Sequence, residues 1–374
     1  MRIAFFTETF LPATDGVVTR LRQTLEELAR LGDDMLVVAP RYPDGGPDTY
    51  AGAPIYRVPG IPFPPYPRIK LSSAHPGVGR ALRAFGPDLV HAVNPFILGP
   101  SGIYYARRLG VPLVASYHTN VAAYARYYNL NALFDAARWW TRQLHNRAEI
   151  NLCTSEAAME YLLDEGVKRV RLWPQGVDAR RFHPDKVSKR WRERLSGGHP
   201  SERVLLYVGR LAPEKGIERL KTILGEVPDT RLAIVGDGPA RRDLELEFAR
   251  TPTIFTGVLG GEDLAAAYAS ADAFLFPSTT DTLGLAMLEA LASGLPIVAA
   301  ASGASREVVS EGENGLLYEA DSAPSLVAAV ARLLSEDGLR ESLSRRARKS
   351  VEWRDWGSAT RVLRGYYEQA LEGI

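Results

Sequence analysis

Short apolar runs recur along the chain, and stretches with apolar residues at helical spacing separate them. The first series comprises Arg2 to Phe6, Met35 to Ala39, Asp88 to Ala92, Pro112 to Ser116, Ile150 to Cys153 and Val170 to Trp173. The second comprises Arg203 to Val208, Arg231 to Val235, Thr253 to Thr256, Asp272 to Phe276, Pro296 to Ala299 and Gly315 to Tyr318. Strands that alternate with helices are typical of parallel sheets. The pattern therefore predicts an α/β protein with two Rossmann-like, doubly wound halves.

A polar segment between the two series predicts the domain boundary. Residues 176–200 contain two glycine- or proline-rich turns and no apolar run, as expected of a linker. We expect an N-terminal domain over residues 1–180 and a C-terminal domain over 181–353. The pattern is helical from Leu326 onward, so a last helix over 354–374 is expected to cross back to the first domain.

Prolines interrupt the strand pattern in one stretch of the first half. They stand at positions 54, 59, 62, 64, 65 and 67. Because proline has no amide proton to donate to a neighbouring strand, it is excluded from central strands. We therefore expect this stretch to be a surface loop.

Composition and charge narrow the class of protein. The 374 residues are 46% hydrophobic and 24% charged, as in ordinary globular proteins with room for two cores. Lys and Arg number 45 and Asp and Glu 44, so no overall positive charge favours nucleic acid as a partner. The single cysteine, Cys153, favours a reducing, cytoplasmic compartment. We expect neither a signal peptide nor a membrane span, because the apolar runs are too short.

The segment Phe274 to Pro296 carries the most informative motif of the chain. It predicts a strand, a polar loop and a helix that ends at a glycine. Ligands of open α/β sheets bind beyond the carboxyl ends of the strands, where amides at a helix N-terminus attract phosphate. The residues expected to supply these amides are Thr282, Leu283, Gly284 and Leu285.

Two carboxylates flank this predicted helix start. Glu289 follows Gly284 by about 7 to 8 Å along a helix, so Glu289 and Asp281 are expected to grip opposite ends of a diphosphate-linked ligand. The alternative is that Asp281 only caps the helix and that Glu289 is a solvated helix residue. Apolar neighbours, Leu288 and residues 290–292, favour the functional interpretation, since a carboxylate among them needs a hydrogen-bonding partner.

A basic pair follows the first strand of the second series. Arg210 and Lys215 lie between Gly209 and Gly216, where a strand runs into a helix. A guanidinium and an ammonium group together neutralise a diphosphate without a divalent metal, and the chain contains no Asp-x-Asp triplet. No metal or other cofactor is therefore expected. The alternative is a pair of surface cations in exposed ion pairs.

Other strand ends carry weaker signals. Gly16 follows the first strand and allows a phosphate close to the backbone, and His118 follows another strand end and is expected near the same crevice. Each residue also has an ordinary structural explanation, a turn glycine or a core histidine. We interpret Gly236 to Pro239 as a tight turn and Asp178 as a helix cap.

Together these motifs resemble family 4 of the retaining glycosyltransferases, and the resemblance covers essentially the whole chain. The family has the two-domain GT-B fold, so it implies two domains that face each other across a cleft. The N-terminal domain would bind the acceptor and the C-terminal domain the nucleotide sugar. The family's two acidic residues separated by seven correspond to Asp281 and Glu289, with Asp where Glu is more usual.

The resemblance also implies roles for these residues. Asp281 and the amides of Leu283 and Gly284 would hold the donor sugar, and Glu289 would bind the ribose. Arg210 and Lys215 match the family's diphosphate-binding pair. Gly16 matches its N-terminal glycine loop, although only one glycine is present, and the edge around Gly257 and Val258 matches its base-binding strand. His118 matches a histidine near the reacting sugar. The residues implied for catalysis are Asp281, His118, Arg210 and Lys215.

Within the family, the chain is most similar to the sulfolipid synthase branch, which transfers sulfoquinovose from its UDP derivative to diacylglycerol. The matching residues are those at 116–120, 176–178 and 194–200, with Trp139 and His145. Neighbouring branches use GDP-mannose with phosphatidylinositol or diacylglycerol and share these motifs. The implied acceptor contacts are Tyr117, His118, Tyr127 and Trp139.

A lipid acceptor implies contact with a membrane surface. Residues 55–71 and 124–147 interleave aromatic with basic side chains, which suits peripheral binding to the inner face of a membrane. The alternative places these aromatic residues in the core. A nucleotide-sugar epimerase, a non-catalytic sensor of nucleotide sugars and a starch or glycogen synthase remain other possible functions of such a chain.

Overall fold

The computed structural model describes residues 1–43, 45–63, 66–72, 76–118, 134–282 and 284–373. Contacts between Cα atoms divide the chain into two compact units. Unit 1 comprises residues 1–175 and 356–374, and unit 2 comprises residues 176–355. The first boundary lies a few residues before the expected one at 180.

Unit 1 is built on an eight-stranded sheet with the order β10-β9-β8-β7-β1-β2-β4-β3. Its strands are β1 (Arg2–Thr7), β2 (Asp34–Pro40), β3 (Thr49–Tyr50), β4 (Ala53–Val58), β7 (Leu89–Val93), β8 (Leu113–Ser116), β9 (Ile150–Cys153) and β10 (Val170–Leu172). All neighbours pair in parallel except β3 and β4. The sheet extends from β1 through β2 on one side and through β7 on the other, so the direction in which successive strands are added reverses at β1.

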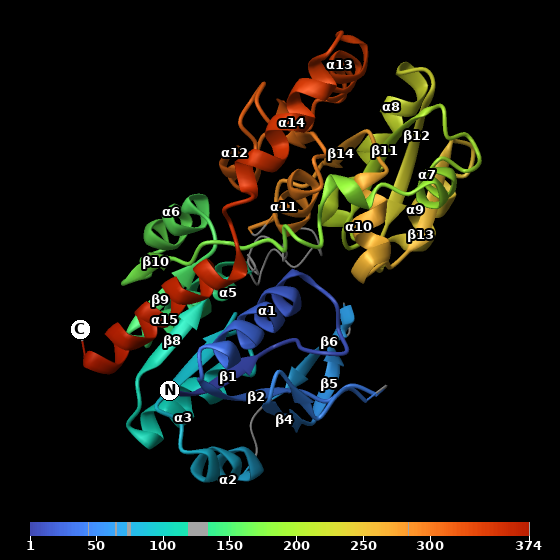
Figure 1. Cartoon of the computed structure of the whole chain (residues 1–374). Coiled ribbons are helices and arrows are strands. Elements are labelled where there is room, and N and C mark those ends of the chain that lie inside the picture. The colour runs from blue at the N-terminus through green and yellow to red at the C-terminus, as the bar shows by residue number, and fades with distance from the viewer. Residues whose placement is uncertain (44, 64–65, 73–75, 119–133, 283, 374) are drawn as a thin grey trace. The chain divides into compact units, whose positions relative to one another are not determined.

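Helices cover both faces of this sheet, so its strands are apolar on both sides. In β1, Ile3 and Phe5 pack under α1 (Gly16–Arg30) and α15 (Trp356–Glu372). Ala4 and Phe6 face the opposite core with α2 (Pro76–Phe85), α3 (Gly99–Leu109) and α5 (Phe134–His145). Figure 1 shows α1 and α15 on one side of the sheet and α2 and α3 on the other. Near the β10 edge, α6 (Glu156–Asp164) packs over β9 and β10.

The last helix belongs to unit 1, which confirms the predicted crossing back of the chain. Leu363 and Tyr367 of α15 are fully buried against the core beside α1. Arg364 donates a hydrogen bond of 3.0 Å to Asp33, and the Tyr366 hydroxyl donates one of 3.1 Å to the carbonyl oxygen of Leu172. Apolar burial and polar contacts therefore both fix the helix to the first half of the chain.

The prediction of a surface loop over the proline-rich stretch is wrong. It contains β4, which pairs in parallel with β2, and the hairpin of β5 (Gly60–Phe63) and β6 (Tyr66–Ser72). Pro54 precedes the first β4 residue paired with β2, so the missing amide removes no bond of that ladder. Pro59 follows β4, and Pro62 and Pro67 lie in the separate hairpin, whereas Pro64 and Pro65 lie outside the described residues. Proline excludes a central strand, but it does not exclude a strand near the edge or a separate hairpin.

Unit 2 is built on a six-stranded parallel sheet with the order β13-β12-β11-β14-β15-β16. Its strands are β11 (Arg203–Val208), β12 (Thr230–Val235), β13 (Thr253–Gly257), β14 (Ala273–Phe276), β15 (Ile297–Ala300) and β16 (Gly315–Tyr318). The direction of strand order reverses between β11 and β14. Both sheets thus have the doubly wound order predicted from the sequence.

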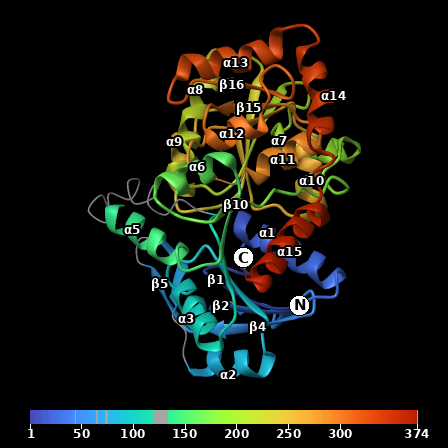
Figure 2. The same ribbon diagram turned by 90° about the vertical axis from the view of Figure 1, so that its left-hand side faces the viewer.

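Two helical layers enclose the sheet of unit 2. One core packs α7 (Lys189–Leu195), α10 (Gly261–Ala269), α11 (Leu285–Ala292) and α14 (Leu339–Val351) against Val204 and Leu206. The other core packs α8 (Lys221–Glu226), α9 (Arg241–Glu247) and α13 (Ala323–Ser335) against Leu205 and Tyr207. Figure 2 shows α13 beside α8 and β16.

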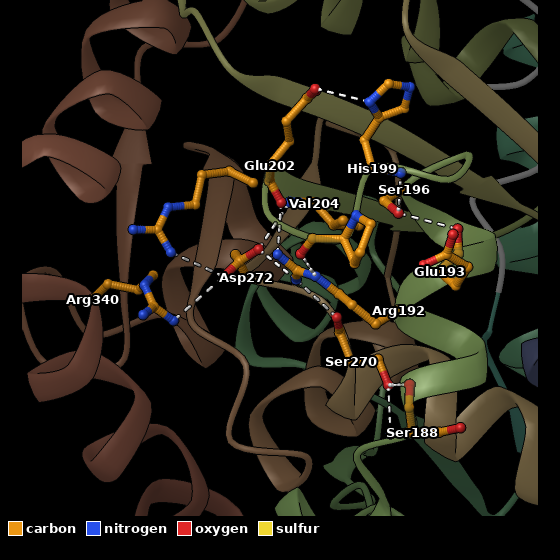
Figure 3. Close-up of polar contacts among 12 residues, drawn as sticks. Ser188, Arg192, Glu193, Ser196, His199, Glu202, Val204, Ser270, Asp272 and Arg340 are labelled. Carbon is orange, nitrogen blue, oxygen red and sulfur yellow. Dashed lines mark hydrogen bonds and ion pairs between the residues drawn. The ribbon is translucent and has the colours of Figure 1, made fainter.

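The expected linker is part of unit 2 rather than a separate connection. Trp191 and Leu195 of α7 are buried in its core. Arg192 donates to Asp272 at 2.6 Å and to the carbonyl oxygen of Ser270 at 3.0 Å (Figure 3). The other oxygen of Asp272 lies 3.6 Å from Arg203, at the amino end of β11. These contacts hold α7 beside the amino ends of β11 and β14, opposite the carboxyl ends of the strands.

Candidate functional site

The candidate site of unit 2 lies where β11 and β14 end side by side. From these two strands the sheet continues in opposite directions, through β12 and β13 on one side and β15 and β16 on the other. Open α/β sheets bind their ligands at such a switch point. The loop after β11 carries Arg210 and Lys215, and the loop after β14 carries Asp281. The topology therefore brings together residues that are more than sixty positions apart.

The loop after β11 places its two cations in different surroundings. Arg210 pairs with Glu214, whose side chain is fully buried. The second carboxylate oxygen of Glu214, Oε2, has no hydrogen-bond partner among the described residues. Lys215 ends the short 3-10 turn η3 (Pro213–Lys215) and is 8% exposed. Because η3 follows β11 at once, both cations are held within a few residues of the sheet.

Asp281 connects the two loops. Its carboxylate pairs with the ammonium group of Lys215, and the nearby hydroxyl of Thr280 donates to the carbonyl oxygen of Glu214 at 3.3 Å. Burial alone would raise the pKa of Asp281, but the charges of Lys215 and Arg210 hold it below its ordinary value. Asp281 is therefore an anion at neutral pH in this cluster.

The helix α11 begins directly after this cluster. Its N-cap residue is Gly284, whose backbone is left-handed with φ of 59°, and no side chain caps the helix. Leu285 is the first helical residue, and Thr282 lies in the preceding loop. Leu283 lies outside the described residues. Amides at an uncapped helix start carry partial positive charge and attract anions.

Glu289 lies one turn further along α11 and has a neutral partner. The hydroxyl of Tyr268, on α10, donates to its carboxylate at 3.0 Å. Burial raises the pKa of Glu289 to about 7, against the opposing effects of Tyr268 and of the charge on Arg181. Glu289 is thus neither an ordinary solvated glutamate nor part of an ion pair, and it titrates near neutral pH.

Glycines allow the loops around the site to pack backbone against backbone. A Cβ atom on Gly236 would lie 1.9 Å from the carbonyl oxygen of Gly209. The amide of Gly236 also donates to the carbonyl oxygen of Gly257 at 2.9 Å, so Gly236 does more than form a tight turn. Gly257 has φ of 78°, and the adjacent Val258 side chain is 59% exposed. The loops after β11, β12 and β13 therefore form one connected surface.

Unit 1 has a comparable loop after β1. Gly16 is the first residue of α1 and follows Asp15, which accepts a hydrogen bond from the Val18 amide at 2.8 Å. Glu8 in the same loop accepts hydrogen bonds from the amides of residues 96–99, at the start of α3. Burial raises the pKa of Glu8 in spite of these four donors. Its side chain thus occupies an amide cluster that would otherwise attract an external anion.

The residues expected to contact the acceptor differ in their exposure to solvent. His118 is buried just after β8, and its Nε2 atom lies 2.8 Å from the Ser116 hydroxyl. Tyr117 lies in a core cluster of unit 1, with its ring 6.0 Å from that of His145. Trp139 is 53% exposed on α5. Tyr127 lies outside the described residues, and the acceptor roles of the other three stay predictions.

Several residues of these sites were not found from the sequence. Glu214 and Tyr268 carry no local signal, because their roles come from partners brought near by the fold. His91, whose Nε2 lies 2.8 Å from the same Ser116 hydroxyl as His118, is a polar residue within the apolar run of β7. Arg20, which contacts the ring of Trp173 as His118 does, lies on the apolar stripe of α1. Those two interruptions of an apolar pattern are signals that a sequence reading could have used.

The described residues show no group of three or more His, Cys, Asp or Glu side chains placed to hold a metal ion. The arrangement in unit 2 instead offers two cations and an uncapped helix start for a diphosphate. Asp281 and Glu289 supply acceptors for hydroxyl groups. In the part of the chain that the structure describes, no helix is long and apolar enough to cross a bilayer.

Comparisons with known proteins match both halves of the chain. The family model described as Glycosyltransferase Family 4 matches residues 14–181, and that described as Glycosyl transferases group 1 matches residues 189–350. The GDP-mannose-dependent alpha-mannosyltransferase of Mycolicibacterium smegmatis is 39% identical over 99% of this chain and 98% of its own. The sulfoquinovosyl transferase of Arabidopsis thaliana is 36% identical over 97% of this chain and 72% of its own.

A solved structure has the same fold. The sucrose-phosphate synthase from Thermosynechococcus elongatus superposes with a TM-score of 0.81 and covers 100% of both chains. At 22% sequence identity, this likeness concerns the fold alone.

Proposed function

Because this chain belongs to the family 4 glycosyltransferases with the GT-B fold, we propose that it transfers a hexose from a nucleoside diphosphate sugar to a lipid acceptor. The observation that carries the donor half of the proposal is the cluster of Arg210, Lys215 and Asp281 at the switch point of unit 2. Its cations and the start of α11 match the charge of a diphosphate.

In this proposal, the incoming diphosphate takes over the contacts of the cations. Arg210 and Lys215 bind phosphate oxygens, and the amides of Thr282, Leu283, Gly284 and Leu285 donate to the phosphate or to the sugar. Asp281 then accepts hydrogen bonds from sugar hydroxyl groups, close to Lys215. Glu289 binds the ribose, and Gly257 and Val258 border the base. The family resemblance assigns Gly16 to the donor as well.

The proposed reaction is a retaining transfer without a metal ion. The bond between the anomeric carbon and the phosphate oxygen breaks, and the diphosphate leaves with both bonding electrons. The acceptor hydroxyl bonds to the anomeric carbon on the face that the phosphate leaves, and its proton passes to that phosphate. Arg210 and Lys215 stabilise the growing negative charge, which is the contribution that lowers the barrier. His118 would contact the reacting sugar, as the family resemblance implies.

Two donors have support from relatives. The 36% identity to a sulfoquinovosyl transferase favours a sulfoquinovose donor. The resemblance to the sulfolipid synthase branch implies its UDP derivative, or a related UDP-hexose, and diacylglycerol as acceptor. The 39% identity to a GDP-mannose-dependent alpha-mannosyltransferase favours GDP-mannose. An epimerase or a non-catalytic sensor would bind the same donors but would need no acceptor.

A surface groove of unit 1 supports the lipid half of the proposal. It has a volume of about 560 Å³ and lies between α3 and α5. The residues that line it are Pro100, Ile103, Tyr104, Arg107, Arg108, Trp140, Leu144 and Arg147. Tyr104, on α3, is 56% exposed. Trp139 and Trp140 are stacked neighbours on α5. Exposed aromatic rings next to arginines suit the interface of a membrane with anionic lipids.

The transfer itself is tested with a panel of donors and acceptors. The protein is incubated with UDP-sulfoquinovose, UDP-glucose or GDP-mannose, with or without vesicles that contain diacylglycerol or phosphatidylinositol, and nucleotide release is measured. We expect one donor to give release that depends on the lipid. Release that is equal without lipid, or conversion of the donor to an isomer, contradicts the proposal.

The membrane contact is tested by vesicle flotation at low salt. Replacing both Arg107 and Arg108 by Gln should weaken binding to anionic vesicles about 30-fold, at about 1 kcal/mol for each charge lost. The control is Arg250→Gln, which removes one exposed cation from unit 2 and should leave flotation unchanged. Wild-type protein that stays at the bottom of the gradient would refute the membrane proposal.

A further inference from the structure

The core of unit 2 holds the hydroxyl group of Tyr268 at a fixed place beside Glu289. Tyr268 is fully buried on α10, which is a neighbour of α11 (Figure 2). Its ring packs against those of Phe182 and Phe274, with 5.6 and 5.7 Å between the ring centroids. The hydroxyl donates to Oε2 of Glu289 at 3.0 Å. Because packed rings enclose the tyrosine, its oxygen stays in place relative to the carboxylate.

The two oxygens of the Glu289 carboxylate have different surroundings. Oε2 accepts from Tyr268, whereas Oε1 has no hydrogen-bond partner among the described residues. Unlike Oε2 of Glu214, Oε1 of Glu289 is not enclosed by protein atoms, so a hydroxyl group of a ligand can reach it. The carboxylate therefore has one oxygen bound to the protein and one available to a ligand.

The charged groups around this carboxylate are occupied elsewhere. Arg181 attracts it, but its guanidinium group is half-exposed and pairs with Asp178 at 3.6 Å. Arg348, on the neighbouring helix α14, donates to backbone carbonyl oxygens. Asp281, before the start of α11, is paired with Lys215. In the part of the chain that the structure describes, the tyrosine therefore supplies the only hydrogen bond to the carboxylate.

A hydroxyl donor favours the ionised form of a carboxyl group. A hydrogen bond to a charged acceptor is stronger than the same bond to a neutral one. Burial disfavours the charged form and raises the pKa of Glu289, and the hydrogen bond from Tyr268 opposes that rise. The same bond fixes which of the two carboxylate oxygens faces the protein.

We propose that Tyr268 is a positioning residue, which keeps the Glu289 carboxylate ionised and turned so that Oε1 receives the ribose. A carboxylate oxygen has two lone pairs, so both ribose hydroxyl groups can donate to Oε1. The inference rests on the proposed function for the ribose. The effect of Tyr268 on the carboxyl group itself is a property of the ligand-free protein.

The ligand-free effect is measured by ¹³C NMR titration of protein labelled at the side-chain carboxyl carbon of glutamate. Glu289→Gln identifies the signal of Glu289, whose midpoint we expect near pH 7. Tyr268→Phe keeps the packed ring and removes the hydroxyl. It should raise the midpoint by about one unit, the difference between a hydrogen bond to a charged and to a neutral acceptor. An unchanged midpoint in Tyr268→Phe overturns the inference.

Tyr318→Phe is the matched control for this titration. Tyr318 is another buried tyrosine of unit 2, and its hydroxyl has no hydrogen-bond partner among the described residues. Its replacement removes a buried hydroxyl without touching Glu289. The midpoint of Glu289 should therefore stay at the wild-type value. An equal rise in Tyr318→Phe would overturn the specific role of Tyr268.

Calorimetry with UDP-glucose and GDP-mannose tests the consequence for the ribose. With a Glu289 pKa of about 7 in the wild type and about 8 in Tyr268→Phe, the ionised fraction at pH 7 falls from about one half to about one in eleven. The variant should bind about fivefold more weakly at pH 7, but only about 1.3-fold more weakly at pH 8.5. A loss of the same size at both pH values would indicate a merely structural role and would overturn the proposal.

A double variant separates the carboxylate from other effects of the tyrosine. In the background of Glu289→Gln, no group titrates at this position. Tyr268→Phe should then change Kd by the same factor at pH 7 and pH 8.5. A loss that is still larger at pH 7 in this background would show that the tyrosine acts through another group.

The two measurements distinguish failure of the inference from failure of the proposed function. If both nucleotide sugars bind and the midpoint of Glu289 does not move in Tyr268→Phe, the inference fails and the proposed function stands. If the midpoint moves but neither nucleotide sugar binds, the proposed function fails, and the role of Oε1 toward the ribose fails with it.

Discussion

If Glu289 binds the ribose as proposed, nucleotide-sugar affinity should depend on pH. Burial raises the pKa of Glu289 to about 7, so both forms of the carboxyl group are populated in the physiological range. In the proposed complex, the ribose hydroxyl groups donate to the carboxylate, and these hydrogen bonds are much stronger to the ionised form than to the protonated one. Protonation of Glu289 and binding of the ribose therefore compete. Because the charged form is the one above pH 7, affinity should fall as the pH is lowered through 7.

The size of the effect follows from the pKa. With a pKa of about 7, about one molecule in eleven has an ionised Glu289 at pH 6, and about ten in eleven at pH 8. If only the ionised form binds, Kd should be roughly tenfold larger at pH 6 than at pH 8. A glutamate with an ordinary pKa would be ionised throughout this range and would give no change.

Titration calorimetry of UDP-glucose and GDP-mannose at pH 6, 7 and 8 measures this dependence. Sugar nucleotides are suitable because they have no terminal phosphate that titrates near pH 6. Glu289→Gln should bind more weakly at pH 8 and should show the same Kd at all three pH values. A pH-independent Kd in the wild type, or a tenfold change that persists in Glu289→Gln, would refute the reasoning for this residue.

Two further predictions concern the loops of unit 2. Lys215→Ala should lower kcat about a hundredfold or more by removing a charge at the diphosphate, and it should lower the melting temperature because Asp281 loses its partner. Adding Asp281→Asn should restore the melting temperature but not kcat. Gly236→Ala should lower the melting temperature because its Cβ would meet a carbonyl oxygen at 1.9 Å, whereas Gly225→Ala, with nothing within 4 Å, should not. Circular dichroism and nucleotide-release assays check these outcomes.

The strands of both sheets were predictable because each is a short apolar run between helical segments. Buried parallel strands need apolar residues on both faces, and this requirement is visible in the sequence. The strand β4 was missed because Pro54 within it and the prolines after it resemble a loop signal. A proline is tolerated in a strand where its missing amide does not face a neighbouring strand, and only the pairing of β4 with β2 shows that this holds for Pro54.

Of the site, the positions at strand ends were predictable and the partners were not. Arg210, Lys215 and Asp281 follow strand ends, where a diphosphate was expected to bind, and the topology makes the two strands neighbours. Glu214 was not expected, because its burial beside Arg210 depends on the 3-10 turn η3, of which it is the middle residue. The raised pKa of Glu289 comes from burial, in spite of the opposing hydrogen bond from Tyr268, and no local pattern shows either effect.

The place of α15 in unit 1 affects the order in which the protein can be completed during synthesis. All of unit 2 precedes this helix in the chain, whereas the core of unit 1 includes Leu363 and Tyr367. Domains fold as they emerge from the ribosome, N-terminal parts first. Here the first half to emerge is the last to be completed, because its final core residues are translated after the whole second half. A nascent chain that stalls before residue 356 therefore has a complete unit 2 beside an exposed apolar face of unit 1.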